Sequence, residues 1–248
     1  MPGMPCQFPG RAPWAEAVVS ADAATAAREA AAQIAAAARE AIRLRGRCVL
    51  ALSGGRAVEP MLRALAREAL DWHAVDVVQT DERIAPADSE DRNLTLLRRC
   101  LLVPAALRPE NLHAMPVEDA DPEAAAGRYA ALLARLAGSP PEIDVVHLGL
   151  GIDGHTASLV PGDPVLGVTD ADVAVTRLYR GRRRMTLTLP VLERARRIVW
   201  LVIGADKAAV LARLQAGDTT LPAGRISVAP ARLYVDRDAA ALLVQPAR

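Results

Sequence analysis

The sequence contains few of the features that mark secreted, membrane-spanning or metal-binding proteins. Its only cysteines are Cys6, Cys48 and Cys100, an odd number without metal-ligand spacing, so neither a disulfide framework nor a zinc site is indicated. No apolar run reaches the roughly 18 residues that a membrane span needs, and the first residues lack the charged-then-apolar order of a secretory signal. These absences argue against a membrane partner and favour a reducing, cytoplasmic location.

Net charge is almost absent as well. The 248 residues include 30 Lys and Arg against 29 Asp and Glu, a balance that gives no support to a nucleic-acid partner. Hydrophobic residues make up 52% of the chain and charged residues 24%, which is ordinary globular composition. A chain of this length can bury a substantial core.

The first thirteen residues differ from the rest. Residues 1–13 carry four prolines and two glycines, a poor start for regular structure, so we expect a flexible tail there. No linker divides residues 14–248, which we expect to form a single domain and to remain a monomer or a weak dimer.

Helical and strand patterns alternate along the chain. Helices are expected over residues 22–45, 59–70, 93–102, 122–136, 207–214 and from 238 onward, and strands over 47–52, 75–80, 143–148, 172–179, 185–189, 197–203 and 233–235. This alternation predicts an α/β fold, with a mostly parallel sheet and helices on both faces.

The stretch 143–162, IDVVHLGLGIDGHTASLVPG, joins an apolar, β-branched run to a glycine-rich polar loop. The run is typical of an inner strand of a parallel sheet. Open α/β sheets bind ligands at the carboxyl ends of their strands, so we expect the chemistry in this loop. Asp153 and His155 supply a carboxylate and an imidazole there, and Thr156 and Ser158 supply two hydroxyls. An isolated Asp-Gly-His would more often cap a short helix.

A second glycine-rich loop, Ser53-Gly54-Gly55, lies between a strand and a helix. A helix N-terminus has unsatisfied N–H donors and the positive end of the helix dipole, so this arrangement is typical of an anion site. The tripeptide alone is more often a turn without a ligand. Arg56, which follows it, either adds charge to such a site or points to solvent.

The strand at 75–80 ends in a third polar group, Asp81-Glu82-Arg83. Charge triplets at strand ends are commonly only solvated. Because the loops at Ser53, Asp81 and Asp153 all follow strands, we expect them to converge on one edge of the sheet.

Two further basic residues are candidates for binding an anion. Arg184 leads directly into the alternating 185–189 segment, whereas the preceding arginines, Arg180, Arg182 and Arg183, are expected in a solvated loop. Lys207 is the only lysine and lies in the expected first turn of a helix, where a cation opposes the dipole and an anionic ligand would relieve the conflict. A lysine retained by chance is the alternative.

Together these motifs resemble the 6-phosphogluconolactonases. LGLGIDGHTASLVPG resembles a signature of that family, and Asp81-Glu82-Arg83 resembles its Asp-Glu-Arg. Arg184 stands in a pattern similar to the family's Arg-x-Thr-Leu-Thr-x-Pro, and Lys207 stands in its Gly-x-x-Lys-Ala. Ser53-Gly54-Gly55 resembles the start of the family's phosphate loop, usually Ser-Gly-Gly-Ser-Thr-Pro.

The chain departs from the family pattern after Gly55, where Arg56-Ala57-Val58 replace Ser-Thr-Pro and two side-chain contacts are lost. The related glucosamine-6-phosphate deaminases share the Gly-x-Asp-Gly-His core. They usually continue differently after His155 and carry another residue at Arg83, so the resemblance favours the lactonases.

The resemblance runs from about Trp14 to the C-terminus and implies the Rossmann-like fold that the lactonases share with these deaminases and with ribose-5-phosphate isomerases. It implies hydrolysis of 6-phosphoglucono-1,5-lactone to 6-phosphogluconate in the oxidative pentose phosphate pathway, which needs neither a metal nor a redox cofactor. His155 would be the general base, assisted by Asp153 and Arg83. The sugar phosphate would be bound by Ser53, Gly54, Gly55, Asp81, Arg184 and Lys207.

Two other functions stay open. A deaminase or aldose-ketose isomerase would need a carboxylate base, for which Asp81 is a candidate. A non-catalytic sugar-phosphate-binding regulator usually carries an added DNA-binding segment, and we expect no room for one here beyond the tail.

Overall fold

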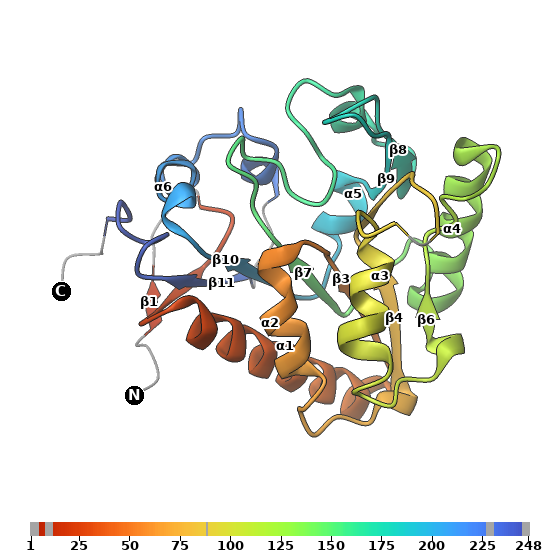
Figure 1. Cartoon of the computed structure of the whole chain (residues 1–248), viewed down its shortest axis with the longest axis horizontal. Helices are drawn as coiled ribbons and strands as arrows, with labels where there is room; N and C mark the ends of the chain where they lie inside the picture. Colours follow the sequence, from red (N-terminus) through yellow and green to blue (C-terminus); the bar gives the residue numbers. More distant parts are fainter. Residues whose placement is uncertain (1–4, 8–11, 88, 227–230, 245–248) are drawn as a thin grey trace.

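The computed structural model describes residues 5–7, 12–87, 89–226 and 231–244. Its centre is an eight-stranded sheet (Figure 1). Across the sheet the strand order is β1 (Pro5–Gln7), β2 (Glu16–Ser20), β11 (Ala231–Asp236), β10 (Ile198–Val202), β7 (Val145–Leu148), β3 (Cys48–Leu52), β4 (Val75–Gln79) and β6 (Leu112–His113). Every neighbouring pair is parallel except β1 and β2. The predicted mostly parallel sheet is therefore confirmed.

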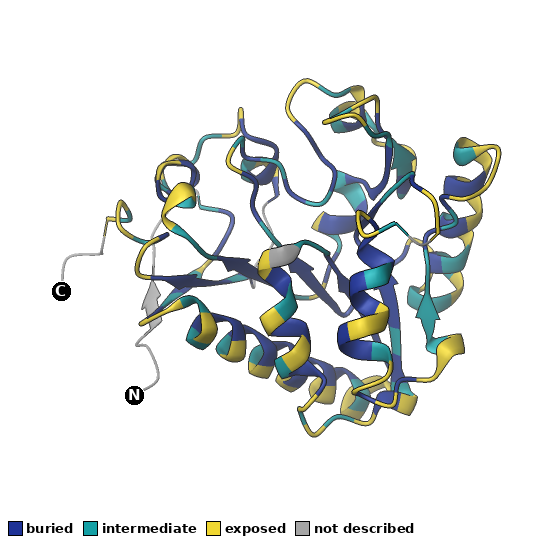
Figure 2. Ribbon diagram, viewed as in Figure 1, coloured by how far each residue is buried: buried dark blue, intermediate teal, exposed yellow. Residues whose placement is uncertain are grey.

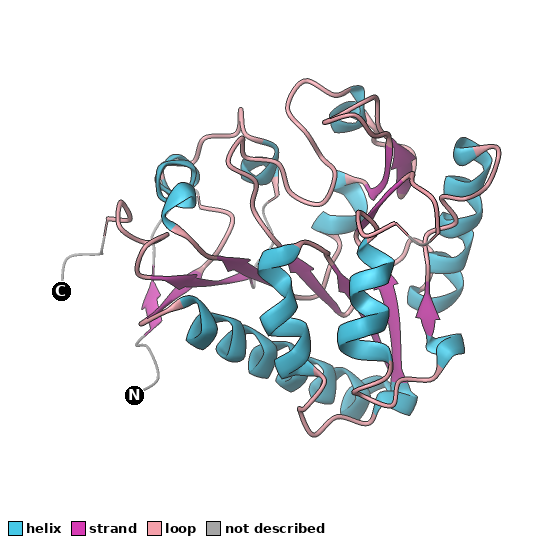
Figure 3. Cartoon of the chain, in the orientation of Figure 1, coloured by secondary structure: helices cyan, strands magenta, loops and turns pink. Residues whose placement is uncertain are grey.

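Helices cover both faces of this sheet, as predicted. One face carries α1 (Ala23–Arg45), α2 (Glu59–Leu65) and α3 (Asn93–Leu97), and the other carries α4 (Pro122–Ala137), α5 (Leu189–Glu193) and α6 (Ala208–Gln215). Successive side chains of a strand point to opposite faces, so Val49 packs on the α4 side and Leu50 on the α1 side. Figure 2 shows buried strands between helices whose outer sides are exposed, and Figure 3 shows α1 running along the sheet.

Short helical turns connect these elements. They are η1 (Arg56–Val58), η2 (Trp72–Ala74), η4 (Pro109–Asn111), η5 (Pro164–Gly167), η6 (Ala205–Lys207), η7 (Pro222–Arg225) and the π-helix η3 (Arg98–Leu102), which continues α3.

The long helix α1 begins and ends where its capping residues predict. The side chain of Asp22 accepts a hydrogen bond of 2.7 Å from the N–H of Thr25. Gly46 ends the helix with φ 76°, a conformation that glycine adopts without steric cost. Small buried side chains such as Ala30 and Ala31 allow the helix to lie close to the sheet.

A second, antiparallel sheet lies beyond the carboxyl edge of the main one. Its order is β5 (Asp81–Arg83), β9 (Arg184–Leu187), β8 (Val173–Val175). Because β5 follows β4 after a single residue, the chain passes directly from one sheet into the other. In Figure 1, β8 and β9 lie near α4. This small sheet covers one side of the candidate site.

Some predicted elements differ from those observed. The helix expected from Asp238 is wrong over the described residues: residues 237–242 form only turns, and the side chain of Asp236 accepts the N–H of Ala239 in place of a helical bond. α2 ends at Leu65 rather than near Leu70. After it, the backbone forms hydrogen bonds between residues three apart, as in a 3₁₀ turn. The strand expected over 172–179 is only three residues long.

The predicted N-terminal tail contains a short strand. Residues 5–7 pair with β2 at the edge of the sheet, whereas residues 1–4 and 8–11 lie outside the described residues. Within the described ranges, no helix is long and apolar enough to cross a membrane.

Candidate active site

The three polar loops converge at the carboxyl ends of the neighbouring strands β7, β3 and β4, as predicted. They enclose a cavity of about 430 Å³. Of the predicted site residues, those that line it are Ser53, Gly54, Gly55, Asp81, Arg83, His155, Arg184 and Lys207. Asp153 is outside this lining and contacts the cavity through His155. One site therefore brings together all the residues selected from the sequence.

Asp153 and His155 form a hydrogen-bonded pair. Nδ1 of His155 lies 2.6 Å from Oδ1 of Asp153, which favours the ring tautomer with its proton on Nδ1 and its lone pair on Nε2. The hydroxyl of Tyr179 donates to Oδ2 of the same carboxylate at 2.6 Å. Burial raises the pKa of Asp153, but the hydrogen bonds from Tyr179 and His155 outweigh burial and lower the pKa to about 2. The carboxylate is therefore ionised at neutral pH.

Gly151 makes room for this pair. A Cβ at residue 151 would lie 2.0 Å from Nδ1 of His155 and 2.6 Å from Oδ1 of Asp153, both far inside contact distance. The N–H of Gly151 also donates to the carbonyl of His155 at 2.8 Å, which closes the loop. The glycine is thus needed for the close approach of the backbone to the pair.

Asp81 organises the centre of the site. Its Oδ2 accepts a 2.6 Å hydrogen bond from Ser158, and its Oδ1 accepts a 3.2 Å bond from Asn93. The side chain is almost fully buried. Both carboxylate oxygens are therefore already engaged within the protein.

The hydroxyl of Ser53 is also engaged. It donates to the carbonyl of His147 at 2.8 Å and accepts from Thr80 at 3.0 Å. Gly54 lies against Asn93, whose Oδ1 would be 2.0 Å from an added Cβ, and Gly55 has φ 114°. Both glycines are therefore required by the backbone, and the hydroxyl holds the loop to β7.

Arg83 and Arg184 are opposite one another on β5 and β9. Arg83 donates to the carbonyl of Asp91 at 2.6 Å, and Arg184 donates to Ser158 at 3.4 Å. The Nε of each guanidinium is buried and has no hydrogen-bond partner in the described part of the chain. Burial and the neighbouring Arg83 lower the pKa of Arg184. Two guanidinium groups held together in this way favour an anionic ligand.

Two more cations reach the cavity. Lys207 lies at the junction of η6 and α6, where its Nζ is 3.1 Å from the carboxylate of Asp206. Arg180 lies in an exposed turn, as predicted for a solvated loop, but it also lines the cavity, which the sequence did not predict. Arg180 reaches the cavity because Arg180 and Gly181 both have positive φ and fold the loop back toward the site.

Glu82 has a structural role. It is fully buried and accepts hydrogen bonds from the backbone N–H groups of Arg83, Asn93 and Leu94. It also forms a 3.2 Å ion pair with the buried Arg92. Glu82 thereby fixes the start of α3 beside β5.

Tyr179 is the main site residue that the sequence analysis missed. The structure shows a tight turn beside it, at Arg180-Gly181, where both residues have positive φ, but the sequence offers only Gly181 as a weak turn signal. The turn pairs Tyr179 with Arg182 and so directs the tyrosine toward the 151–155 loop.

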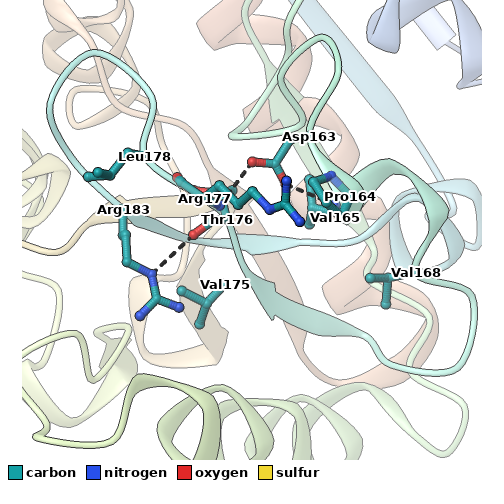
Figure 4. Close-up of a pocket in the computed structure, with 9 residues that line it drawn as sticks. All are labelled: Asp163, Pro164, Val165, Val168, Val175, Thr176, Arg177, Leu178 and Arg183. Atoms are coloured by element: carbon teal, nitrogen blue, oxygen red, sulfur yellow. Dashed lines mark hydrogen bonds between the residues drawn. The ribbon is translucent and has the colours of Figure 1, made fainter.

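A second hollow, of about 730 Å³, lies beside β8 (Figure 4). It is lined by Asp163, Pro164, Val165, Val168, Val175, Thr176, Arg177, Leu178 and Arg183. The guanidinium of Arg183 is paired with Glu123, and Asp163 accepts the backbone N–H groups of Val165 and Arg177. These charged groups are occupied, so the cavity at His155 is the better candidate for an active site.

Within the described residues, no group of three or more His, Cys, Asp or Glu side chains is arranged to hold a metal ion.

Comparison with known proteins identifies the family of the chain. A sequence model described as glucosamine-6-phosphate isomerases/6-phosphogluconolactonase matches residues 21–235. The chain is 41% identical over 179 residues to the 6-phosphogluconolactonase of Synechocystis sp., covering 71% of this chain and 74% of that protein. It is 38% identical over 217 residues to the 6-phosphogluconolactonase of Mycobacterium tuberculosis, covering 82% and 88%.

Solved structures give the same result. The 6-phosphogluconolactonase of Trypanosoma brucei superposes with a TM-score of 0.77 and 27% identity, covering 92% of this chain and 98% of that one. A monomeric glucosamine-6-phosphate deaminase superposes with a TM-score of 0.80 at 21% identity, a likeness of fold alone. The chain therefore belongs to the family of glucosamine-6-phosphate isomerases and 6-phosphogluconolactonases.

Proposed function

We propose that the protein is an enzyme that hydrolyses 6-phosphoglucono-1,5-lactone to 6-phosphogluconate. The observation that carries the proposal is the shared cavity: His155, held by an ionised Asp153, opens onto the same space as the paired arginines Arg83 and Arg184. An imidazole base beside a cluster of cations suits a neutral electrophile that carries an anionic group. The relatives named 6-phosphogluconolactonase support the choice of substrate.

His155 is the general base in this proposal. Nδ1 is occupied by Asp153, so Nε2 takes a proton from water while the water oxygen bonds to C1 of the lactone. The bond between C1 and the ring oxygen then breaks, and the imidazolium returns its proton to that oxygen. Asp153 stabilises the imidazolium during both steps.

Arg83 polarises the lactone carbonyl. A guanidinium stays charged and donates two hydrogen bonds in a fixed geometry, so it stabilises the oxyanion as the tetrahedral centre forms. Lys207, Arg184 and the loop Ser53-Gly54-Gly55 bind the phosphate. With the Ser53 hydroxyl engaged by His147, we assign the contact of this loop to its backbone.

Deamination or isomerisation is the less favoured activity. It would need a free carboxylate base, and both oxygens of Asp81 already accept hydrogen bonds. The cytoplasmic location, the monomeric or weakly dimeric state and the independence of metal and redox cofactors stay predictions from the sequence.

A coupled assay tests the proposed activity. Freshly prepared lactone and glucosamine 6-phosphate are offered separately, and the enzyme-free opening of the lactone is subtracted. We expect acceleration with the lactone only. Turnover of glucosamine 6-phosphate would identify a deaminase. Turnover of neither substrate would favour a non-catalytic sugar-phosphate-binding protein.

A further inference from the structure

Tyr179 lies behind the cavity wall, at the junction of the two groups of side chains that the proposed reaction uses. It is absent from the cavity lining, whereas His155, Arg180 and Arg184 belong to that lining. Its hydroxyl donates to Oδ2 of Asp153 at 2.6 Å. Any effect of Tyr179 on the reaction therefore passes through its neighbours.

The hydroxyl and His155 bind different oxygens of the same carboxylate. His155 uses Oδ1 and Tyr179 uses Oδ2, so the carboxylate is held at both ends. The two rings also contact each other edge to face, with centroids 5.6 Å apart. Without the hydroxyl, Oδ2 of Asp153 would be unbound, and the carboxylate would be held only at Oδ1, by the ring of His155 at 2.6 Å and its backbone N–H at 3.4 Å.

The ring of Tyr179 contacts the cations of the site. The guanidinium carbons of Arg180 and Arg184 lie 5.1 and 4.9 Å from the ring centroid, within the range of cation–π attraction. These two positive charges repel each other, and Arg83 adds a third beside Arg184. An aromatic face offsets part of this repulsion while leaving the guanidinium groups available to an anion.

The backbone holds the tyrosine in place. Tyr179 and Arg182 exchange two backbone hydrogen bonds, of 2.9 and 3.2 Å, around the turn at Arg180-Gly181. Such a two-residue turn fixes the register of the hairpin. Tyr179 is therefore anchored independently of the 151–155 loop that it contacts.

We propose that Tyr179 is a positioning residue that holds Asp153 against His155 through its hydroxyl and supports Arg180 and Arg184 on its ring. This inference rests on the proposed lactonase activity and assigns separate roles to the hydroxyl and the ring of Tyr179. The hydroxyl serves the chemical step, and the ring serves the binding of the phosphorylated substrate.

Two substitutions separate these roles. Tyr179→Phe removes only the hydroxyl, so kcat should fall about tenfold or more while KM stays within about twofold. Tyr179→Leu removes the ring as well, so KM should also rise several-fold. Tyr234→Phe is the matched control. The hydroxyl of Tyr234 donates to Gln33 of α1, on the face of the main sheet that α1 covers, so its loss should leave kcat and KM unchanged.

The ¹⁵N chemical shifts of the histidine rings give a readout that is independent of activity. Labelled wild-type protein should show His155 protonated on Nδ1, with the signal assigned by its loss in His155→Asn. In Tyr179→Phe we expect a mixture of tautomers, with unchanged circular dichroism and thermal midpoint. An unchanged tautomer or an unchanged kcat in Tyr179→Phe would overturn the positioning role, and an unchanged KM in Tyr179→Leu would overturn the role of the ring. If the wild type does not open the lactone, the proposed function fails, and the NMR comparison still decides whether Tyr179 positions the pair.

Discussion

Arg83 and Arg184 face each other across β5 and β9 with their charges in the same cavity. Like charges directly opposite on neighbouring strands destabilise a sheet, so this pair opposes folding in the absence of a ligand. Their placement indicates that an anion is part of the functional state.

Arg184→Gln should therefore have opposite effects on stability and function. Removing one of the two charges should raise the free energy of unfolding of the unliganded protein by about 0.5 kcal/mol. Losing one charge-assisted hydrogen bond of about 1.5–3 kcal/mol should lower kcat/KM for the phosphorylated lactone at least about tenfold. Urea unfolding and initial rates measure the two effects. Arg182→Gln, on the same hairpin but paired with Asp91, is the control. If Arg184→Gln lowers the free energy of unfolding and Arg182→Gln does not, Arg184 stabilises the fold and the account of the pair is wrong.

Lys207→Ala should mainly weaken binding. Lys207 lines the cavity, where its Nζ lies beside Asp206. It belongs to a different loop from the Asp153–His155 pair. We expect KM for the phosphorylated lactone to rise about tenfold with kcat little changed, as for the loss of a contact made equally in the ground and transition states. Unphosphorylated gluconolactone, which we expect to be a far poorer substrate because it lacks the anion, should be unaffected. An unchanged preference for the phosphate would remove Lys207 from the site.

Gly151→Ala tests the geometry of the catalytic pair without altering a charged group. The added Cβ would overlap His155 and Asp153, so the pair must separate, and kcat should fall about 100-fold or more. Gly167→Ala is the control, because a Cβ at residue 167 meets nothing within 4 Å and lies outside the cavity lining. A Gly151→Ala enzyme with the wild-type kcat would show that the observed pairing is not needed for turnover.

His147 should make stability depend on pH. It is fully buried on β7, neither ring nitrogen has a hydrogen-bond partner among the described residues, and burial lowers its pKa to about 3. Between about pH 6.5 and 3 the unfolded chain therefore binds a proton that the folded chain does not, so stability falls as the pH falls through that window.

His147→Leu should remove this dependence. The unfolding free energy of the wild type should decrease relative to the variant by up to about 1.4 kcal/mol per pH unit below pH 6. Urea unfolding of both proteins at pH 7, 6 and 5 measures the difference between their free energies of unfolding. The other titrating groups are the same in both proteins, so their contributions cancel in this difference. Parallel curves would show that His147 is hydrated or protonated in the folded protein.

The sequence predicted most of what local chemistry determines. The ends of α1, the central strands and the three polar loops follow from capping residues, apolar runs and glycines that act within a few positions. The Asp153–His155 contact was also predictable, because the two residues lie only two positions apart in the chain.

Long-range contacts were not predictable in the same way. Tyr179 reaches Asp153 across 26 positions of the chain, and Ser158 reaches Asp81 across 77, and neither contact has a local signal in the sequence. The engaged hydroxyl of Ser53 likewise depends on His147, a residue of another strand. The helix expected from Asp238 failed because, although alanine favours helices, the local bonds to Asp236, whose side chain accepts the N–H of Ala239, favour turns over residues 237–242.

The turnover number of His155→Asn tests the central claim most directly. Asparagine preserves a polar side chain of similar reach but cannot take a proton from water, so kcat should fall about 10²- to 10⁴-fold while KM changes little. His73→Asn, at an exposed residue far from the cavity lining, is the matched control. The rate is measured with fresh lactone, and an enzyme-free trace is subtracted at each pH. A His155→Asn enzyme that keeps most of its corrected turnover would contradict the account and move the base to another residue, with Asp81 the next to test.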